Sequence, residues 1–364
     1  MGGPADEVTP LTHNPLNAVT GGIWRVEVGG RTAVVKVLTD GSTHDGPAWW
    51  SASDDDATHW NWWRREACVY ADDLAQWFRP HGIDAPPLLA LDQRDDGTVV
   101  LWLDWVDGCP GADVEVDGLA ELAGRLGQVQ ARLAADGPDG HVLRDTTWLS
   151  RGYLDRYSAS KPIDEIRLDD DKAWTHPRVA AHLGRLREPL RRLHHARGHY
   201  VELAARCPRT LCHLDLWPAN LTRRAEGDGG GFVLFDWSFC GDGALGEDVA
   251  NLIPDSVFDL LYPADALDEI AESVETAYLA GLHEGGWRGD ERWVRLGIRA
   301  AAVKYHWLVD GLLTDPDREH RLVYGGRIVD ADDLYHARAV ALALLTRWAD
   351  EADTLAAALG GPHG

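Results

Sequence analysis

Cysteine, lysine and long apolar runs are all scarce in this chain of 364 residues. The five cysteines are odd in number and form no C-x-x-C pair, which argues against a disulfide framework or a zinc cage. No apolar run approaches the roughly 18 residues that a membrane-spanning helix needs. The first residues, MGGPADEVTPLTHNP, lack the basic and apolar regions of a signal peptide. We therefore expect a protein of the reducing cytoplasm that does not enter a membrane.

Positive charge is also in short supply. The chain has 35 Lys and Arg residues against 59 Asp and Glu residues, which gives a formal net charge of −24. A field of this sign repels phosphate backbones and anionic lipids, so general binding of nucleic acid or of membrane surfaces is excluded. The same field either serves solubility alone or attracts a cationic small molecule, and both interpretations stay open.

Lysine occurs only four times, at positions 36, 161, 172 and 304, so each lysine is a rare choice. Tryptophan is abundant instead, with 17 residues against five phenylalanines. Five tryptophans gather early in the chain: Trp49, Trp50, Trp60, Trp62 and Trp63. Such a group is typical of core packing, or else of a binding platform near a cleft.

The order of the patterns predicts two lobes. Alternating apolar residues around the Gly29-Gly30 turn predict a hairpin, helical spacing follows, and two further strands come before residue 107. The predicted segments are strands at 23–28, 31–38, 88–91 and 98–106, and one helix at 60–77. Later segments read mostly as helices, at 119–135, 150–157, 177–207, 266–284, 291–313 and 338–359, with strand-like stretches at 209–213 and 231–235. We expect an α+β fold with a β-rich lobe over 1–106 and a helical lobe over 107–364.

A cluster of polar residues accompanies the two strand-like stretches. His213, Asp215 and Asn220 form the pattern H-x-D-x-x-x-x-N, and Asp236 ends the next apolar strand. Transfer of a γ-phosphoryl group needs metal ions that neutralise phosphate oxygens and a positioned acceptor hydroxyl. Asn220 and Asp236 offer the oxygen ligands that Mg²⁺ prefers, and Asp215 can orient the hydroxyl by accepting its hydrogen bond. The spacing therefore predicts phosphoryl transfer.

These residues, with Gly246-Glu247-Asp248 after them, resemble the aminoglycoside phosphotransferases and choline kinases, which share the protein-kinase-like fold. The resemblance is strongest over 207–253 and extends more loosely over 20–110. It implies two lobes with ATP or GTP in the cleft between them, Asp215 as the catalytic residue, and Asn220 and Asp236 as Mg²⁺ ligands. The family usually has glycine between the His and the Asp of the loop, where this chain has Leu214.

The first lobe offers matching nucleotide-binding residues. A kinase-like lobe needs a strand lysine for the α- and β-phosphates and a helix glutamate that holds this lysine. Lys36, in Ala33-Val-Val-Lys-Val, is the only lysine in the first 160 residues, and Glu66 lies in the predicted helix that follows. We assign Lys36 to the phosphates and Glu66 to the ion pair with it.

Other site residues are assigned with alternatives. Gly21 and Gly22 predict either a nest of backbone N–H groups near the phosphates or a plain turn before a strand. By resemblance, the backbone from Asp104 to Val106 hydrogen-bonds the adenine edge. His213 is expected to brace the loop rather than transfer protons, and Asp248 to cap a helix or to hold the loop's backbone. Acceptor contacts are expected from Trp217, Asp255, Lys304 and His306, in the segments 148–174, 254–263 and 304–310.

The sequence thus predicts an ATP-dependent O-phosphotransferase that acts, with Mg²⁺ and with GTP as an alternative donor, on a hydroxyl of a small amine-bearing molecule. An aminoglycoside, an amino sugar or a related natural product would fit. One alternative is a Ser/Thr kinase of a natural-product precursor peptide. Another is a pseudokinase-like binding module, against which the intact set of Lys36, Asp215, Asn220 and Asp236 argues. The oligomeric state stays open.

Overall fold

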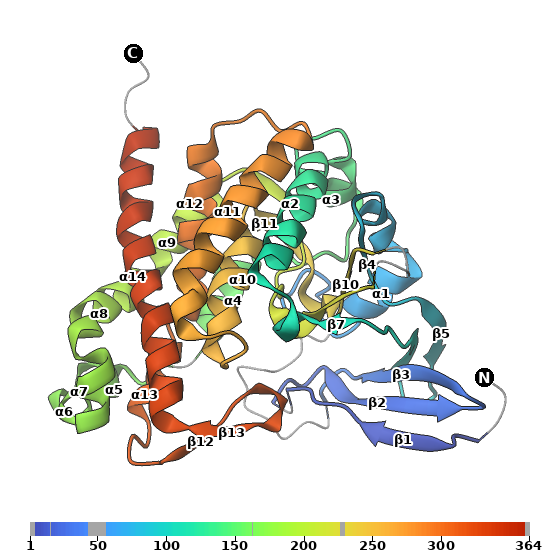
Figure 1. The fold of residues 1–364 in the computed structure, drawn as a ribbon. Coiled ribbons are helices and arrows are strands. Elements are labelled where there is room, and N and C mark those ends of the chain that lie inside the picture. Colours follow the sequence, from blue (N-terminus) through green and yellow to red (C-terminus); the bar gives the residue numbers. More distant parts are fainter. Residues whose placement is uncertain (1–3, 15, 43–55, 162, 226–229, 361–364) are drawn as a thin grey trace.

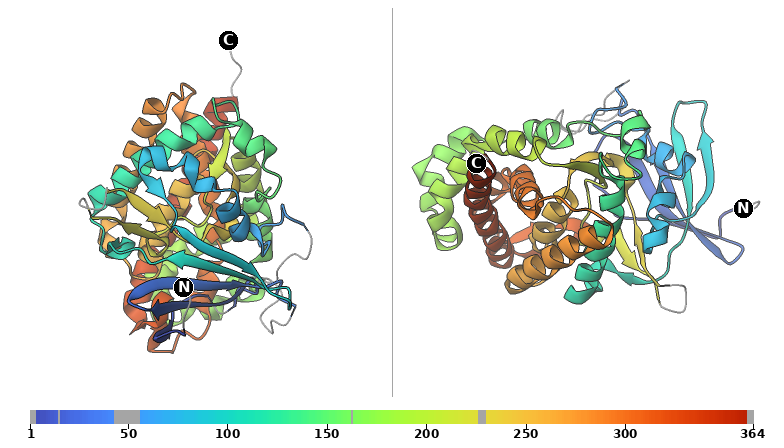
Figure 2. Two further views of the ribbon diagram at one scale, coloured as in Figure 1. Left: turned by 90° about the vertical axis from the view of Figure 1, so that its right-hand side faces the viewer. Right: turned by 90° about the horizontal axis from the view of Figure 1, so that it is seen from above.

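The computed structural model describes residues 4–14, 16–42, 56–161, 163–225 and 230–360. A β-sheet forms one end of the molecule and helices form most of the rest (Figure 1). The view from above in Figure 2 separates the two parts, with the first strands on one side and the last helix on the other. The boundary at residues 106 and 107 stays a prediction.

The first lobe is built on an antiparallel sheet with the strand order β1-β2-β3-β6-β5. The strands are β1 (Glu7–Pro10), β2 (Thr20–Val28), β3 (Arg31–Leu38), β5 (Leu88–Gln93) and β6 (Val99–Asp104). The β2–β3 turn lies at Gly29 and Gly30, whose φ angles of 57° and 76° are easy for glycine alone. β1 is a strand that the sequence pattern missed, because all four of its residues are exposed and none alternates with a buried one.

The helix expected over 60–77 is shorter in the structure. It comprises α1 (Arg65–Ala71), followed by 3₁₀ turns at Leu74–Trp77 and Arg79–His81. The chain leaves the helix at Asp73, whose φ is +49°. Of the early tryptophans, Trp60 and Trp63 are buried in the core, which favours the packing interpretation for these two. Trp49 and Trp50 lie outside the described residues.

The second lobe is mainly helical. Its helices are α2 (Val116–Leu133), α3 (His141–Asp145), α4 (Tyr153–Ser160), α5 (Glu165–Asp169), α6 (Asp171–Thr175), α7 (Pro177–Leu183), α8 (Arg187–His195), α9 (Arg197–Ala205), α10 (Glu247–Phe258), α11 (Leu267–Glu284), α12 (Glu291–Ala301), α13 (Leu308–Leu313) and α14 (Ala331–Gly360). α2 and α11 lie side by side (Figure 1), and a Cβ on Gly281 would come within 1.9 Å of the Gly124 carbonyl oxygen. The two glycines therefore allow this close approach. Within the described residues, no helix is long and apolar enough to cross a bilayer.

Two long helices of the sequence interpretation are divided. The segment 177–207 is split into α7, α8 and α9, with a 3₁₀ turn at Gly184–Leu186. The segment 291–313 is interrupted by a 3₁₀ turn at Ala302–Tyr305, between α12 and α13. Apolar spacing continues through both interruptions, so periodicity alone could not reveal them.

Short strands hold the polar cluster. β8 (Arg209–Cys212) pairs with β11 (Gly241–Ala244), and β10 (Phe232–Leu234) lies between β9 (Leu221–Arg223) and β4 (Ile83–Asp84). β7 (Cys109–Pro110) pairs with β9, and β12 (His320–Leu322) forms a hairpin with β13 (Ile328–Asp330). The loop from 213 to 220 joins β8 to β9, and Asp236 lies two residues after the end of β10. Because β9 and β10 pair antiparallel, the end of the loop 213–220 and the residues after β10 lie next to each other.

Candidate active site

Lys36, Glu66 and Asp236 form one charged group although they come from β3, α1 and the end of β10. The Lys36 Nζ lies 2.5 Å from Glu66 Oε2 and 2.8 Å from Asp236 Oδ1. Lys36 and Glu66 are buried, with 4% and 2% of their surface exposed. Burial by itself would lower the pKa of Lys36, but the two carboxylates outweigh this effect and raise it. The lysine is therefore held as a buried cation at the wall of the cleft.

The loop after β8 places Asp215 beside Asn220. The Asn220 Nδ2 donates to the Asp215 backbone oxygen at 3.0 Å and to Asp215 Oδ2 at 2.9 Å. Burial is the first cause, and the nearby Asp236 the second, of a rise in the pKa of Asp215 to about 7. For Asp236, burial works against the charged form, but Lys36 outweighs it and lowers the pKa.

Leu214, which stands where the family that this sequence resembles usually has glycine, adopts a left-handed backbone with φ of +67°. Its N–H donates to Asp248 Oδ1 at 2.7 Å, and the N–H of His213 donates to Asp248 Oδ2 at 2.9 Å. Its carbonyl accepts from Asn251 Nδ2 at 2.8 Å and from Lys304 Nζ at 3.3 Å. The structure therefore uses Asp248 to hold the loop, while Gly246 takes the cap position of α10.

His213 lies behind the loop as a neutral ring. Burial lowers its pKa to about 4. Its Nε2 lies 2.9 Å from the Phe235 carbonyl oxygen, and its Nδ1 lies 3.3 Å from the Asp215 backbone N–H. This pattern fits a neutral imidazole that donates from Nε2 and accepts at Nδ1. The ring thus links the strand end before Asp236 to the backbone of Asp215.

A cleft of about 1060 Å³ contains this polar cluster. On the side of the first lobe, Asp104, Trp105 and Val106 line it, as expected of a segment that meets the nucleotide base. Further lining comes from Leu11–Asn14, Leu16 and Asn17, between β1 and β2. No sequence pattern indicated this segment, because the strand before it went unrecognised.

One of the two interpretations of Gly21 and Gly22 requires a correction. They lie inside β2, at a register shift, so they do not form a turn before the strand. Thr20 and Ile23 on either side of them line the cleft, and the contact of their backbone N–H groups with phosphates stays a prediction. A Cβ on Gly21 would come within 2.7 Å of the Thr39 side chain, and one on Gly22 within 2.2 Å of the Trp24 ring. Close packing inside the sheet is the physical reason for these two glycines.

Three of the four expected acceptor residues line the cleft: Trp217, Asp255 and Lys304. His306 does not, and its assignment to the acceptor is wrong. It is buried on the side of α8, where its Nδ1 lies 3.1 Å from the Nδ1 of His194. The 3₁₀ turn at Ala302–Tyr305 directs Lys304 and Tyr305 to the cleft and carries the next residue away from it.

Sequence reasoning missed several lining residues of the second lobe. Tyr305, Tyr324, Asp259 and Arg338 come from a 3₁₀ turn, from the tip of the β12–β13 hairpin, from the end of α10 and from α14. No short motif joins them. Only the packing of distant segments brings them together, although Tyr305 and Asp259 fall in segments expected near the acceptor.

The residues present fit the Mg²⁺ ion that the family implies. Asn220 uses its amide nitrogen on Asp215, so its Oδ1 stays available, and Asp236 adds a carboxylate whose side chain is 38% exposed. Within the described residues, no three His, Cys, Asp or Glu side chains form a metal cage. A site with one carboxylate and one amide oxygen suits Mg²⁺, which takes few protein ligands and keeps several waters.

Residues 23–292 match the model of the APH family, described as the phosphotransferase enzyme family. No curated protein matches the sequence. Among solved structures, a microcompartment-associated aminopropanol kinase is 17% identical, with a TM-score of 0.50 over 95% of this chain and 94% of that one.

Two further structures are similar at a TM-score of 0.49. One is the amicoumacin kinase hAmiN with AMP-PNP, Ca²⁺ and Ami, at 12% identity over 95% of this chain and 88% of that one. The other is a thermostable mutant of the aminoglycoside phosphotransferase APH(4)-Ia in a ternary complex with AMP-PNP and hygromycin B, at 15% identity over 96% of each chain. The expected kinase-like fold and enzyme class are confirmed, and because the family model covers most of its length, the chain belongs to the phosphotransferase enzyme family.

Proposed function

We propose that this protein transfers the γ-phosphoryl group of ATP to a hydroxyl group of a small molecule. The observation that carries the proposal is the convergence of Lys36, Glu66, Asp215, Asn220 and Asp236 in one cleft. These residues come from both lobes and are up to 200 positions apart in the sequence. A positioned cation, hard oxygen ligands and a carboxylate near the acceptor are the parts that phosphoryl transfer needs.

Each residue has a role in this scheme. Lys36, held by Glu66, binds the α- and β-phosphates, and the backbone from Asp104 to Val106 meets the base. Asp236 and Asn220 would hold Mg²⁺, which when bound neutralises charge on the phosphate oxygens. The transfer requires these groups to hold the triphosphate in line with the acceptor.

Asp215 orients the acceptor hydroxyl. The hydroxyl oxygen forms a bond to the γ-phosphorus while the bond from that phosphorus to the β–γ bridging oxygen breaks, and ADP leaves with the bonding electrons. Asp215 accepts the hydroxyl proton late, once the new bond has made it acidic. His213 and Asp248 act through the backbone, because they hold the loop that carries Asp215.

The nucleotide part is tested by calorimetric titration with AMP-PNP, with and without Mg²⁺, and with GMP-PNP for comparison. We expect Mg²⁺-dependent binding of AMP-PNP that Asp236→Asn removes. The transfer part is tested by mass spectrometry of hydroxyl compounds incubated with Mg-ATP. The proposal fails if no nucleotide binds, or if nucleotide binds but no small molecule of any charge class gains a phosphoryl group.

A further inference from the structure

The acceptor side of the cleft, beyond Asp215, is predominantly aromatic. Its walls come from α4, the loop 213–220, α10, the segment 304–308, the β12–β13 hairpin and α14. The aromatic lining residues are Tyr157, Trp217, Phe258, Tyr305, Trp307 and Tyr324. The rings of Trp217 and Tyr324 meet edge to face with centroids 4.6 Å apart. Such a wall favours a ligand with an aromatic or apolar face.

Acidic and basic side chains both line this side of the cleft, and each already has a partner within the protein. Among the described lining residues there, two are acidic, Asp255 and Asp259, and two are basic, Lys304 and Arg338. Asp259 forms an ion pair of 2.9 Å with Arg338. Asp255 accepts a hydrogen bond from the Tyr305 hydroxyl, and burial raises its pKa to about 8. Among the described lining residues beyond Asp215, acidic side chains therefore do not outnumber basic ones, despite the net charge of −24 of the whole chain.

A polycationic ligand would meet unfavourable conditions here. Its ammonium groups would lose water beside Lys304, which is buried and donates to the Leu214 carbonyl. They would also have to compete with Arg338 for Asp259 and with the Tyr305 hydroxyl for Asp255. Desolvation of a cation is costly unless a free anion compensates it.

The β12–β13 hairpin adds an apolar edge at the mouth. Leu322 lines the cleft although 66% of its surface is exposed. Its partner across the hairpin, Ile328, is 73% exposed but does not line the cleft. Most of the apolar surface of Leu322 is not covered by the protein, so a ligand in the cleft can bury it.

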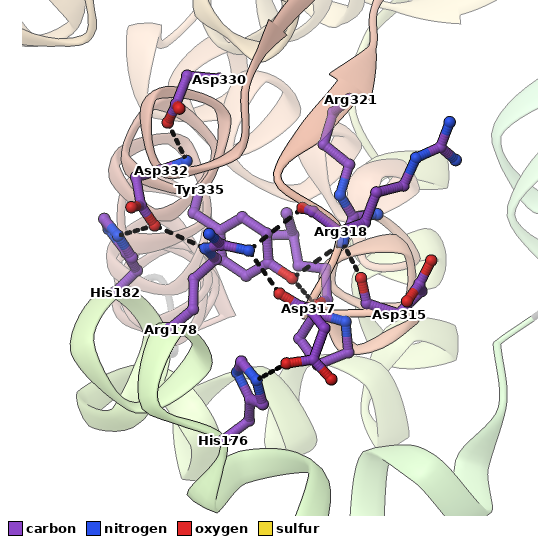
Figure 3. Close-up of polar contacts among 12 residues, drawn as sticks. His176, Arg178, His182, Asp315, Asp317, Arg318, Arg321, Asp330, Asp332 and Tyr335 are labelled. Atoms are coloured by element: carbon purple, nitrogen blue, oxygen red, sulfur yellow. Dashed lines mark hydrogen bonds and ion pairs between the residues drawn. The ribbon is translucent and has the colours of Figure 1, made fainter.

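Ion pairs fix the base of this hairpin to the helical lobe (Figure 3). Arg178 of α7 binds Asp332 at 2.7 Å and the Pro316 carbonyl at 2.6 Å, and His176 binds Asp317 at 3.0 Å. These contacts join the segment before β12 and the start of α14 to α7. The apolar wall is thus formed before any ligand arrives, which reduces the entropy lost on binding.

We propose that the acceptor is an uncharged hydroxyl compound with an aromatic or apolar face, which packs against Trp217, Tyr324 and Leu322. This replaces the amine-bearing acceptor that the net charge suggested, and it rests on the proposed function of the same cleft. The hydroxyl would point towards Asp215, and the apolar face would lie against the hairpin.

Four glycosides that differ in two features test this proposal. They are 4-nitrophenyl β-D-glucopyranoside, its 2-amino-2-deoxy analogue, and the two corresponding methyl glycosides. Dissociation constants are measured by calorimetry with Mg²⁺–AMP-PNP already bound, so failure of nucleotide binding is seen separately. We expect the neutral aryl glycoside to bind at least about tenfold more tightly than its amino analogue and than the neutral methyl glycoside.

Two hairpin variants complete the test. Leu322→Ser should reduce the advantage of the aryl group, whereas Ile328→Ser, a change at a similarly exposed residue outside the cleft, should leave this advantage unchanged. Tighter binding of the amino compounds, no gain from the aryl group, or no binding of the neutral aryl glycoside to the nucleotide-loaded protein overturns the proposal. Loss of the aryl preference in both serine variants would also overturn it, because the contact would then not be specific to Leu322.

Discussion

The carboxylate of Asp248 accepts the N–H of Leu214 at 2.7 Å, in a loop where Leu214 has a left-handed backbone. A leucine with φ of +67° has a strained backbone. This conformation persists because the N–H and the carbonyl of Leu214 are both hydrogen-bonded to side chains of α10. The strain lies directly before Asp215. The position of the proposed catalytic carboxylate therefore depends on a backbone that Asp248 and Asn251 hold in place.

The strain at Leu214 can be measured with two variants. Leu214→Ala and Leu214→Gly both remove a buried side chain that packs with Trp60 and Phe239, at a cost of about 2–5 kcal/mol. Elsewhere glycine is less stable than alanine by about 0.5–1 kcal/mol, but left-handed backbone costs other residues roughly 1–2 kcal/mol. We expect Leu214→Gly to be at least as stable as Leu214→Ala in urea unfolding. If Leu214→Ala were clearly more stable than Leu214→Gly, as alanine is at ordinary positions, the result would contradict the left-handed φ of Leu214.

Removal of the Lys36 ammonium should destabilise the protein as well as the site. Lys36→Met leaves Glu66 buried without its cation, which costs about 3–5 kcal/mol. The double variant Lys36→Met with Glu66→Leu should recover most of this stability but no nucleotide binding, as measured by urea unfolding and AMP-PNP calorimetry. Nucleotide binding by the double variant would show that Lys36 does not hold the phosphates.

The half-buried carboxyl of Asp255 should make stability depend on pH. Its pKa is about 8 in the folded protein and about 3.9 in an unfolded chain. Its contribution to stability is therefore complete below about pH 4 and is lost as the pH rises towards 8. Asp255→Asn removes this loss, so the stability of the variant relative to wild type should rise by about 1–3 kcal/mol between pH 5 and pH 8. A difference that does not change with pH would contradict the raised pKa of Asp255.

Arg178 should affect the binding of the acceptor and not the binding of the nucleotide. Arg178→Ala removes three hydrogen bonds that anchor the hairpin, which should cost about 1–3 kcal/mol and weaken binding of the aryl glycoside probe. AMP-PNP affinity should stay unchanged. Arg347→Ala is the control, because its exposed pair with Asp268 is worth about 0–1 kcal/mol. Equal losses in the two variants would mean that the network does not anchor the wall.

The sequence predicted those parts of the site that depend on local pattern. Lys36 lies on a strand with regular alternation, and the loop from His213 to Asn220 keeps its functional residues within eight positions. Glu66 could be placed beside Lys36 because a family resemblance supplied the pairing. In each case, the residue could be predicted from the pattern of its neighbours in the sequence or from a known motif.

Residues brought in by tertiary packing could not be predicted in the same way. β1 has no buried face, so the lining segment after it had no recognisable pattern. Tyr324 and Arg338 reach the cleft only through the hairpin and α14, and His306 turns away because a 3₁₀ turn precedes it. The charge of the acceptor side likewise depends on which side chains pair, as with Asp259 and Arg338, and not on their number.

The most direct test of the proposed activity compares wild type with Asp215→Asn in two measurements on the same samples. One is AMP-PNP affinity with Mg²⁺, and the other is ATP turnover with the neutral aryl glycoside or with water as acceptor. We expect unchanged nucleotide affinity, because the amide oxygen introduced by the substitution can still accept from Asn220 Nδ2. We expect a loss of about 10²–10⁴-fold in turnover, because the group that accepts the hydroxyl proton is gone. Turnover that survives the substitution, or nucleotide affinity that falls with it, would contradict the assignment of Asp215.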